Sequence, residues 1–169
     1  MKKTQHVSGF VPVLKVSGLA LSVLLAALIL TSLAAGMYQT RKMERDPRHA
    51  IFRSGKLPSP PPDGFYKGTE FTGRGKSWQG KVFDRAASTG INQFTDGQRY
   101  RFKTYAAQGL RDKDKTVFRI DYNQPGNPWW LRFIVDEIVQ IAPGQYQGKV
   151  HLQVIPGLPF TISYFELAS

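Results

Sequence analysis

Hydrophobic positions follow two different patterns along the chain. Residues 16 to 38 form an uncharged, mostly apolar run, whereas apolar and polar residues alternate in many stretches after residue 63. A run of this length is typical of a membrane-spanning helix, because ~1.5 Å per residue gives about 34 Å against a hydrocarbon core of ~30 Å. Alternation is typical of strands that bury one face. The patterns therefore predict a mainly β, antiparallel domain preceded by one N-terminal transmembrane helix.

The middle of the domain shows the clearest alternation. Residues 99 to 103 alternate cations with aromatic rings, and residues 116 to 122 resume the alternation after a charged stretch at 111 to 115. Each alternating stretch is interpreted as a strand with one apolar face. We interpret the charged stretch as the tip of the hairpin that joins these strands, and not as a binding patch. The side chains expected on the inner face are Tyr100, Phe102, Phe118, Ile120 and Tyr122.

The C-terminal third repeats this pattern. Residues 145 to 154 alternate, and residues 160 to 167 are apolar on both faces, which is typical of a strand covered on two sides. Shorter strand candidates lie at 64 to 68 and at 78 to 84, the second with a helical alternative that continues to residue 87. The inner face is expected to hold Tyr146, Val150, Leu152, Val154 and, from the last strand, Tyr164. The outer face is expected to hold Lys149, Gln153 and an exposed His151.

Residues 127 to 144 support two interpretations. An asparagine followed by proline is typical of a helix N-terminus, but the middle of the segment is rich in Ile and Val. We favour a helical turn at 127 to 131, then a strand at 133 to 141 that ends in a Pro-Gly hairpin turn. In this strand Asp136 lies at the surface and Glu137 points inward. Because a buried carboxylate is costly when unpaired, Glu137 is expected to meet a cation of a neighbouring strand or a ligand.

The N-terminal third predicts membrane attachment. Residues 1 to 15 are expected to be a cytoplasmic stub and residues 16 to 38 an uncleaved anchor, the alternative being a signal peptide cleaved after Ala34. Basic residues flank both ends of the run, and we expect the Lys-rich start to stay in the cytoplasm with the domain on the other side. Residues 39 to 62 predict a basic linker that ends in a polyproline II spacer. Residues 63 to 169 then form the barrel domain.

Composition narrows the classes of function. The formal net charge of +11 is concentrated in residues 1 to 60, which hold 9 basic and 2 acidic residues, whereas the remainder holds 14 and 10. The net charge of the domain is therefore modest, and its aromatic rings are expected to face inward and not to form a surface on which bases stack. Both features argue against nucleic-acid binding. The chain has no cysteine and three histidines, so no disulfide, metal site or cofactor is expected.

Catalytic motifs are also missing from the sequence. There is no Gly-x-Ser-x-Gly elbow, phosphate loop or His-Glu-x-x-His pair. Asp136 and Glu137 do not form a catalytic pair, because neighbours on a strand point to opposite faces. An enzyme is therefore the less favoured class.

Three short stretches carry a family resemblance. They are Gly64-Phe65-Tyr66-Lys67-Gly68, Trp78-Gln79-Gly80-Lys81 and Tyr164-Phe165-Glu166-Leu167. With the spacing of the strands, they resemble the lipocalin-like group of small β-barrels, including uncharacterised bacterial proteins, over residues 64 to 167. The glycine-x-tryptophan signature of lipocalins is not matched, since Lys76 and Ser77 precede Trp78, so no ligand-binding residue is carried over. The resemblance implies a barrel whose interior holds one apolar molecule.

These observations predict a membrane-anchored lipocalin-like β-barrel that binds a lipid or another hydrophobic small molecule without catalysis. A structural or interaction protein of the bacterial envelope, with a filled barrel, is the alternative. The expected location is the bacterial inner membrane with the domain on the periplasmic side, and the expected partners are the membrane, through residues 16 to 38, and the small molecule. The candidate ligand-binding residues are Tyr100, Phe102, Phe118, Tyr122, Trp129, Trp130, Glu137, Tyr146 and Tyr164.

Overall fold

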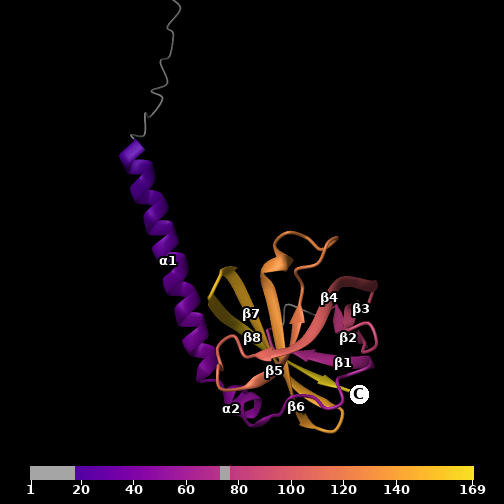
Figure 1. Cartoon of the computed structure of the whole chain (residues 1–169). Helices are drawn as coiled ribbons and strands as arrows, with labels where there is room; N and C mark the ends of the chain where they lie inside the picture. The colour runs from indigo at the N-terminus through magenta and orange to yellow at the C-terminus, as the bar shows by residue number, and fades with distance from the viewer. Residues whose placement is uncertain (1–17, 73–76) are drawn as a thin grey trace, which may run out of the picture. The chain divides into compact units, whose positions relative to one another are not determined.

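The computed structural model describes residues 18–72 and 77–169, in which two helices precede eight β-strands (Figure 1). The chain divides into two compact units, one up to Ala34 and the other from Ala35 to Ser169. The helices are α1 (Gly18–Glu44) and α2 (Pro47–Ser54), and a short 3₁₀ helix, η1 (Leu131–Phe133), precedes the sixth strand. The strands are β1 (Gly64–Glu70), β2 (Trp78–Asp84), β3 (Thr89–Phe94), β4 (Gly97–Gln108), β5 (Thr116–Asp121), β6 (Ile134–Ala142), β7 (Gln145–Ile155) and β8 (Leu158–Ala168).

Helix α1 has the properties of a membrane span. It is long and apolar enough to cross a bilayer, and none of the residues in its apolar window is buried by the rest of the protein. A helix in the core of a soluble domain would bury at least one face against its neighbours. A membrane anchor and a signal sequence share this exposed, apolar character, so retention of the helix stays a prediction.

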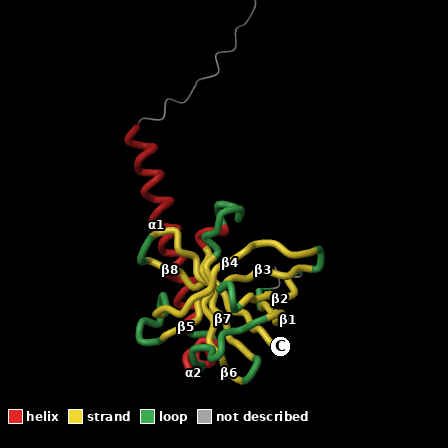
Figure 2. Tube along the Cα trace, turned by 45° about the vertical axis from the view of Figure 1, so that its right-hand side comes forward, coloured by secondary structure: helices red, strands yellow, loops and turns green. Residues whose placement is uncertain are grey.

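The strands close into a single barrel. They pair in sequence order, each antiparallel to its neighbours, and β8 returns to pair with β1 (Figure 2). Closure leaves no unpaired strand edge and confirms the predicted mainly β fold with a preceding apolar helix. Since each strand reverses direction, the connections that follow β1, β3, β5 and β7 lie at one end, here called the mouth end. The connections that follow β2, β4 and β6 lie at the opposite, closed end.

Most strands lie where the sequence pattern predicted them. The segment at 78 to 84 is a strand, so its helical alternative is wrong. The segment at 127 to 144 contains β6, which confirms the predicted strand, and its helical turn lies slightly later than predicted, at Leu131–Phe133. The predicted hairpin turn is confirmed as well. Gly144 adopts a φ of 68°, a left-handed conformation that favours glycine.

Strand β3 was not predicted from the sequence. Its inward positions hold Gly90, Asn92 and Phe94, so apolar and polar residues do not alternate along it. Gly90 is required by packing, because a Cβ at this position would overlap the ring of Phe102. The missing periodicity therefore reflects what the barrel interior needs at each of these three positions.

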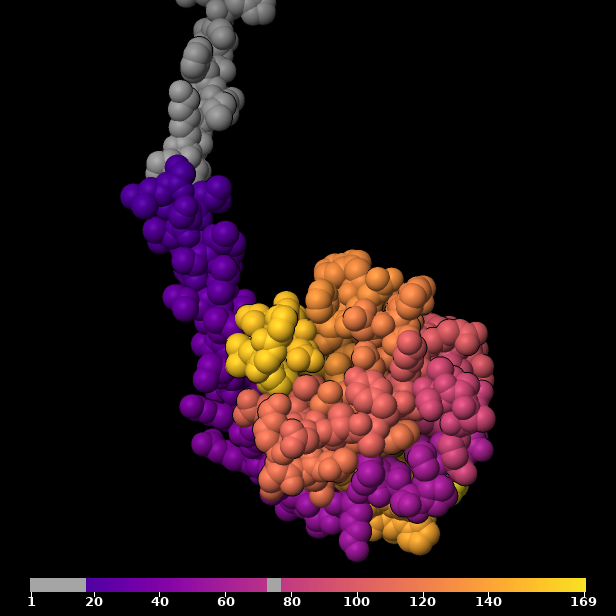
Figure 3. Space-filling model, viewed as in Figure 1, coloured from indigo at the N-terminus to yellow at the C-terminus, as the bar shows by residue number. Residues whose placement is uncertain are grey.

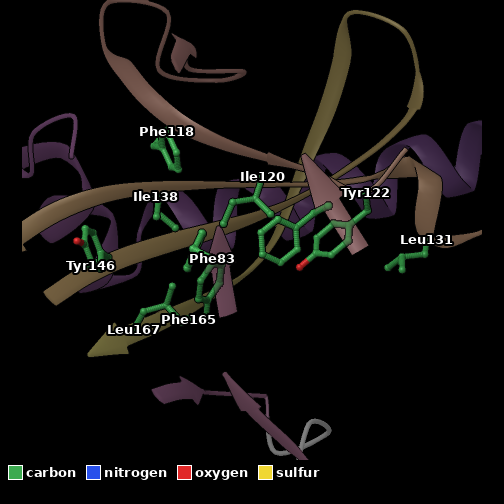
Figure 4. Packing of buried hydrophobic residues seen from close by; sticks show 10 residues of the cluster. Phe83, Phe118, Ile120, Tyr122, Leu131, Ile138, Tyr146, Phe165 and Leu167 are labelled. Carbon is green, nitrogen blue, oxygen red and sulfur yellow. The ribbon is translucent and has the colours of Figure 1, made fainter. Parts of the chain in front are cut away.

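The half of the barrel interior nearest the closed end is filled by apolar side chains (Figure 4). Its rings meet edge to face, with 5.5 Å between the ring centres of Phe83 and Phe102 and 5.2 Å between those of Tyr66 and Tyr146. Such ring pairs contribute about 0.5–1.5 kcal/mol each beyond the area they bury. The cluster continues to the cavity in the other half, which Tyr122, Leu131 and Phe165 also line. Its buried members are Phe83, Phe102, Phe118, Ile120, Tyr122, Leu131, Ile138, Tyr146, Phe165 and Leu167.

A second apolar cluster lies on the outer surface of the barrel, against α2. It contains Phe52, Val117, Val139 and Tyr164, with Met43 packed beside them. Phe52 is fully buried, although it lies in the segment that the sequence predicted to be a linker. The part of the outer face that holds Val117, Val139 and Tyr164 is therefore covered by the chain that precedes the barrel.

The rest of the predicted linker is docked as well. The backbone N–H of Lys56 donates to the carbonyl of Gln140 at 2.9 Å, and the N–H of Gln140 returns a bond of 2.7 Å. Arg85 Nε donates to the carbonyl of Pro61 at 2.7 Å, and Pro62 is buried. The prediction of a free polyproline spacer is wrong, because this segment bonds to the barrel and packs on it instead of extending into solvent.

In β6, the residues that point into the barrel are those predicted to point outward, and the reverse. Ile138 packs in the barrel core, and Asp136, two positions earlier, lies inside as well, whereas Glu137 and Val139 lie on the outer face. Both carboxylates are buried, with exposed fractions of 4% for Asp136 and 0% for Glu137. Asp136 is therefore not a surface residue and Glu137 does not point inward. Apolar residues on both faces of this strand, Ile138 inside and Val139 outside, are buried, so hydrophobicity alone did not identify the inner face.

Strand β7 has the predicted facing at Tyr146, Lys149, Val150 and His151, but Val154, predicted to face inward, is 53% exposed, and the outer face is not exposed as predicted. Lys149 and His151 lie on the outer face, yet their exposed fractions are 1% and 0%. Lys149 lies beneath α2, with its Nζ 4.2 Å from the centre of the Phe52 ring, and His151 is buried in a network with Glu137 and Thr161 of the flanking strands. The prediction that His151 is exposed is wrong, because alternation reports the face of a strand and not what covers that face.

Candidate functional site in the barrel interior

The half of the barrel nearest the mouth end contains an open cavity. Its volume is about 230 Å³. The wall is mostly aromatic and aliphatic, and four polar residues form the base of the cavity, here called the polar floor. The floor consists of Lys81, Asn92, Tyr122 and Asp136, and the remaining lining residues are Glu70, Trp78, Phe94, Tyr100, Leu131, Ile134, Val150, Ser163, Tyr164 and Phe165.

Lys81 lies at the centre of the polar floor. Its ammonium group donates to Asp136 Oδ2 at 2.9 Å, to Asn92 Oδ1 at 3.0 Å and to the hydroxyl of Tyr122. Lys81 lies in β2, whereas its partners come from β3, β6 and the residue that follows β5. The network therefore forms only when the barrel closes. All three hydrogen-bond donors of the lysine are thereby engaged.

Aromatic rings surround the same ammonium group. Lys81 Nζ lies 5.1 Å from the ring centres of Tyr122 and Phe165, 5.4 Å from that of Phe102 and 5.5 Å from that of Trp78. A cation within ~6 Å of an aromatic face is attracted by the ring quadrupole. The rings therefore offset part of the cost of removing the charge from water.

Burial changes the protonation equilibria of the floor. It lowers the pKa of Lys81, an effect that the carboxylate of Asp136 opposes. Burial, with the negative charge of Asp136 beside it, raises the pKa of Tyr122 well above its ordinary value. Tyr122 consequently keeps its proton at any physiological pH and donates it to Asp136 Oδ2 at 3.2 Å.

One oxygen of the floor has no partner. Asp136 Oδ1 is buried without a hydrogen bond, while Oδ2 of the same carboxylate accepts from two groups. A buried polar atom without a partner costs about 1–3 kcal/mol. Asp136, which lines the cavity, thus retains capacity for one more donor at a carboxylate oxygen that is itself buried.

The predicted ligand-binding residues divide into four groups. Tyr100 and Tyr122 line the cavity, whereas Phe102, Phe118 and Tyr146 pack in the filled half of the barrel. Trp129 and Trp130 lie in the β5–β6 connection at the mouth end, where Trp130 meets Tyr100 edge to face at 6.1 Å. Glu137 and the ring of Tyr164 lie on the outer face.

Tyr164 borders the cavity, but its ring packs in the outer cluster and its hydroxyl donates to the carbonyl of Met43 at 3.0 Å. Sequence reasoning missed Lys81, Asn92 and Asp136. A signal for Lys81 existed, since it is a cation at an alternating position between the apolar neighbours of β2.

Glu137 is the centre of a separate buried network on the outer face. Its Oε1 accepts from the N–H of Leu110 at 2.7 Å and lies 3.4 Å from Arg119 Nη2, while Oε2 lies 3.1 Å from His151 Nε2. Thr161 continues the network, with its hydroxyl 3.2 Å from His151 Nδ1. Glu137 therefore holds the β4–β5 connection against the barrel and does not contact the cavity.

This network makes the protein sensitive to acid. Burial raises the pKa of Glu137, but the bonds to His151 and to the Leu110 N–H, with the charge of Arg119, outweigh it and lower the pKa. A carboxylate whose pKa is lower in the folded state stabilises above its unfolded pKa of about 4.3, and this contribution is lost as the pH falls through the folded value. We expect Glu137→Gln to lower the free energy of unfolding by about 1–3 kcal/mol at neutral pH.

Urea unfolding of the full-length protein in detergent micelles, followed by far-ultraviolet circular dichroism at neutral pH and in acid, checks this expectation. The difference between wild type and Glu137→Gln is expected to shrink in acid, because the wild-type carboxylate is then protonated. Glu166→Gln, at a partly exposed position of β8, is the control and is expected to cost little. A difference between wild type and Glu137→Gln that does not depend on pH would contradict the assignment.

Comparisons with known proteins add no relative. No family model, no curated protein and no solved structure matches the chain. Among residues 18–72 and 77–169, no group of three or more His, Cys, Asp and Glu side chains is arranged to hold a metal ion.

Proposed function

We propose that this protein is a membrane-anchored β-barrel that binds a compact hydrophobic molecule in the mouth half of the barrel. The observation that carries the proposal is the open cavity with an apolar wall and a polar floor. Ligand sites commonly measure ~300–1,000 Å³, so a cavity of about 230 Å³ suits a molecule of one or two rings, or one end of a longer lipid chain.

The polar floor supports a ligand with a hydrogen-bond donor at its inner end. An N–H or O–H group that reaches Asp136 Oδ1 would supply the bond that this oxygen lacks. A hydrogen bond to a charged group contributes about 1.5–3 kcal/mol. The floor favours binding over catalysis, because the donors of Lys81 are all engaged and the amine is not available as a nucleophile.

The apolar stretch of α1 supports the membrane part of the proposal. We place the barrel on the extracytoplasmic side of a bacterial inner membrane, with the Lys-rich start of the chain in the cytoplasm. Proteolysis of sealed right-side-out membrane vesicles tests this orientation. The barrel should be digested from outside, whereas protection of the barrel would reverse the orientation.

Ligand binding is tested with two probes of nearly equal shape. Indole carries one N–H donor, and benzofuran replaces that group with an oxygen that only accepts. For the full-length protein in lipid nanodiscs, we expect both probes to bind and indole to bind about fivefold more tightly, since one hydrogen bond contributes about 1 kcal/mol. Titration calorimetry, with empty nanodiscs subtracted to remove partitioning into lipid, measures both affinities.

A cavity-filling variant provides the structural control. Val150→Phe adds a ring to the cavity wall and is expected to weaken binding of both probes about tenfold or more. Val154→Phe is the matched control, because Val154 belongs to the same strand but is 53% exposed. Equal binding by wild type and Val150→Phe would show that the probes bind elsewhere and would remove the basis of the proposal.

A further inference from the structure

Exposed apolar side chains gather at the mouth end of the barrel. Trp129 and Trp130, in the β5–β6 connection, are 75% and 48% exposed, and Val154 and Ile155, at the β7–β8 hairpin, are 53% and 41% exposed. Phe71, directly after β1, is 43% exposed but is not counted with them, because the guanidinium of Arg48 in α2 lies 4.2 Å from the centre of its ring. Figure 3 shows the orange β5–β6 connection and the yellow β7–β8 hairpin on the molecular surface.

These side chains are not explained by the packing of the barrel. Single exposed apolar residues are ordinary, but a group of four drawn from two connections at one end of a fold marks a contact surface. Trp129 and Phe133 meet edge to face, at 6.4 Å between ring centres, and Trp129 projects most of its indole into solvent. Tryptophan is enriched where proteins meet the interface of a bilayer, because its ring is apolar and its N–H is polar.

The path of the chain favours a lipid bilayer as the partner of this surface. The barrel unit starts at Ala35, and its second residue, Gly36, lies against the ring of Phe160. Phe160 is the third residue of β8, so the first residues of this unit lie near the mouth end. A Cβ at Gly36 would come within 2.7 Å of that ring, so the two are in close contact. The uncharged run of the sequence ends at residue 38, and the first cations that follow are Arg41 and Lys42.

A run that spans a bilayer leaves it where the uncharged residues end. The residues at that boundary belong to the barrel unit and lie beside the start of β8, near the β7–β8 hairpin. Exposed Arg132, two residues after the tryptophan pair, also suits the phosphate groups of lipid headgroups. A bilayer surface at this end accounts for the position of the chain and for the chemistry of the exposed side chains together.

We propose that the mouth end of the barrel rests on the bilayer, with Trp129, Trp130, Val154 and Ile155 in the interfacial layer of the lipid. This inference rests on the proposed function insofar as residues 16 to 38 are retained as an anchor. It deepens that function, because the cavity then opens toward lipid, and its hydrophobic occupant is exchanged with the membrane instead of with the aqueous phase.

Fluorescence quenching by brominated lipid tests the inference. The chain has three tryptophans, and the variant Trp129→Ser/Trp130→Ser leaves Trp78 in the cavity wall as the single emitter. In phosphatidylcholine nanodiscs with brominated acyl chains, we expect about twofold quenching of the full-length wild type relative to unbrominated lipid, and little quenching of the variant. Because both replaced residues are largely exposed, circular dichroism of the variant should match that of wild type.

Aqueous iodide distinguishes the other outcomes. If iodide quenches the fluorescence of Trp129 and Trp130 and brominated lipid does not, these side chains are exposed to water and the inference is wrong. If neither reagent reaches them, a protein surface such as a second copy covers the pair, which also overturns it. Flotation of the full-length protein with vesicles shows whether residues 16 to 38 attach the protein to the membrane, independently of the quenching results. The indole and benzofuran titrations test the cavity without involving Trp129 or Trp130.

Discussion

Replacing Lys81 with methionine is expected to lower the free energy of unfolding by about 3–5 kcal/mol, because the substitution leaves a buried carboxylate without its counter-ion. Lys81 is 2% exposed, and its ammonium group lies 2.9 Å from Asp136 Oδ2. Of the hydrogen bonds to the carboxylate, only the one from the hydroxyl of Tyr122 then remains. Urea unfolding of full-length protein in detergent micelles measures the loss.

A second substitution separates the charge from the shape of the site. In Lys81→Met/Asp136→Leu neither charge remains, and we expect most of the lost stability to return, since a buried ion pair is often no more stabilising than apolar residues of similar size. Lys103→Met, at an exposed position of β4, is the control and is expected to change stability by less than about 0.5 kcal/mol. A Lys81→Met protein as stable as the control would mean that the pair is not formed in solution.

Replacing Phe52 with alanine is expected to cost about 3–5 kcal/mol as well, the usual range for a large ring removed from a core. Phe52 is fully buried against Val117, Val139 and Tyr164, and its ring also covers the ammonium group of Lys149 at 4.2 Å. The substitution therefore removes apolar contacts and also the aromatic ring that packs against the buried ammonium group of Lys149. The same unfolding measurement in detergent micelles applies.

The neighbouring residue supplies the control for this prediction. Ile51 lies in the same helix but is 41% exposed, so Ile51→Ala is expected to cost less than about 1 kcal/mol. If the two variants were equally stable, the segment would behave as the free linker that its composition suggests, and α2 would not be part of the folded barrel unit.

The two buried networks have different roles. The pair of Lys81 and Asp136 lies inside the barrel at the base of an open cavity, with one carboxylate oxygen unbonded. The network around Glu137 lies outside, where each carboxylate oxygen has a partner. An unpaired acceptor in a residue that lines a cavity suits a binding site, whereas a buried carboxylate with both oxygens bonded contributes to stability. The adjacent carboxylates of β6 are thus assigned to different tasks by the strand geometry alone.

The sequence predicted the elements that depend on local periodicity. Alternation identified the strands at 99 to 103, 116 to 122 and 145 to 154, since residues two apart share one face of a strand. The uncharged run identified α1, because the length of an apolar helix is fixed by the number of residues. The strand β3 lacked this signal, because Gly90 and Asn92 occupy inward positions that packing and hydrogen bonding, rather than hydrophobicity, select.

By itself, then, the sequence determined that a long apolar helix precedes a chain of alternating strands. The tertiary structure decided how the barrel closes, which face of β6 is inside and what covers the outer face. Lys81 and Asp136 are 55 positions apart and meet only across the closed barrel. Both faces of β6 are buried, so a pattern that separates apolar from polar residues does not distinguish the core from a surface covered by α2. The physical reason is that periodicity records the direction of a side chain, whereas burial depends on segments distant in sequence.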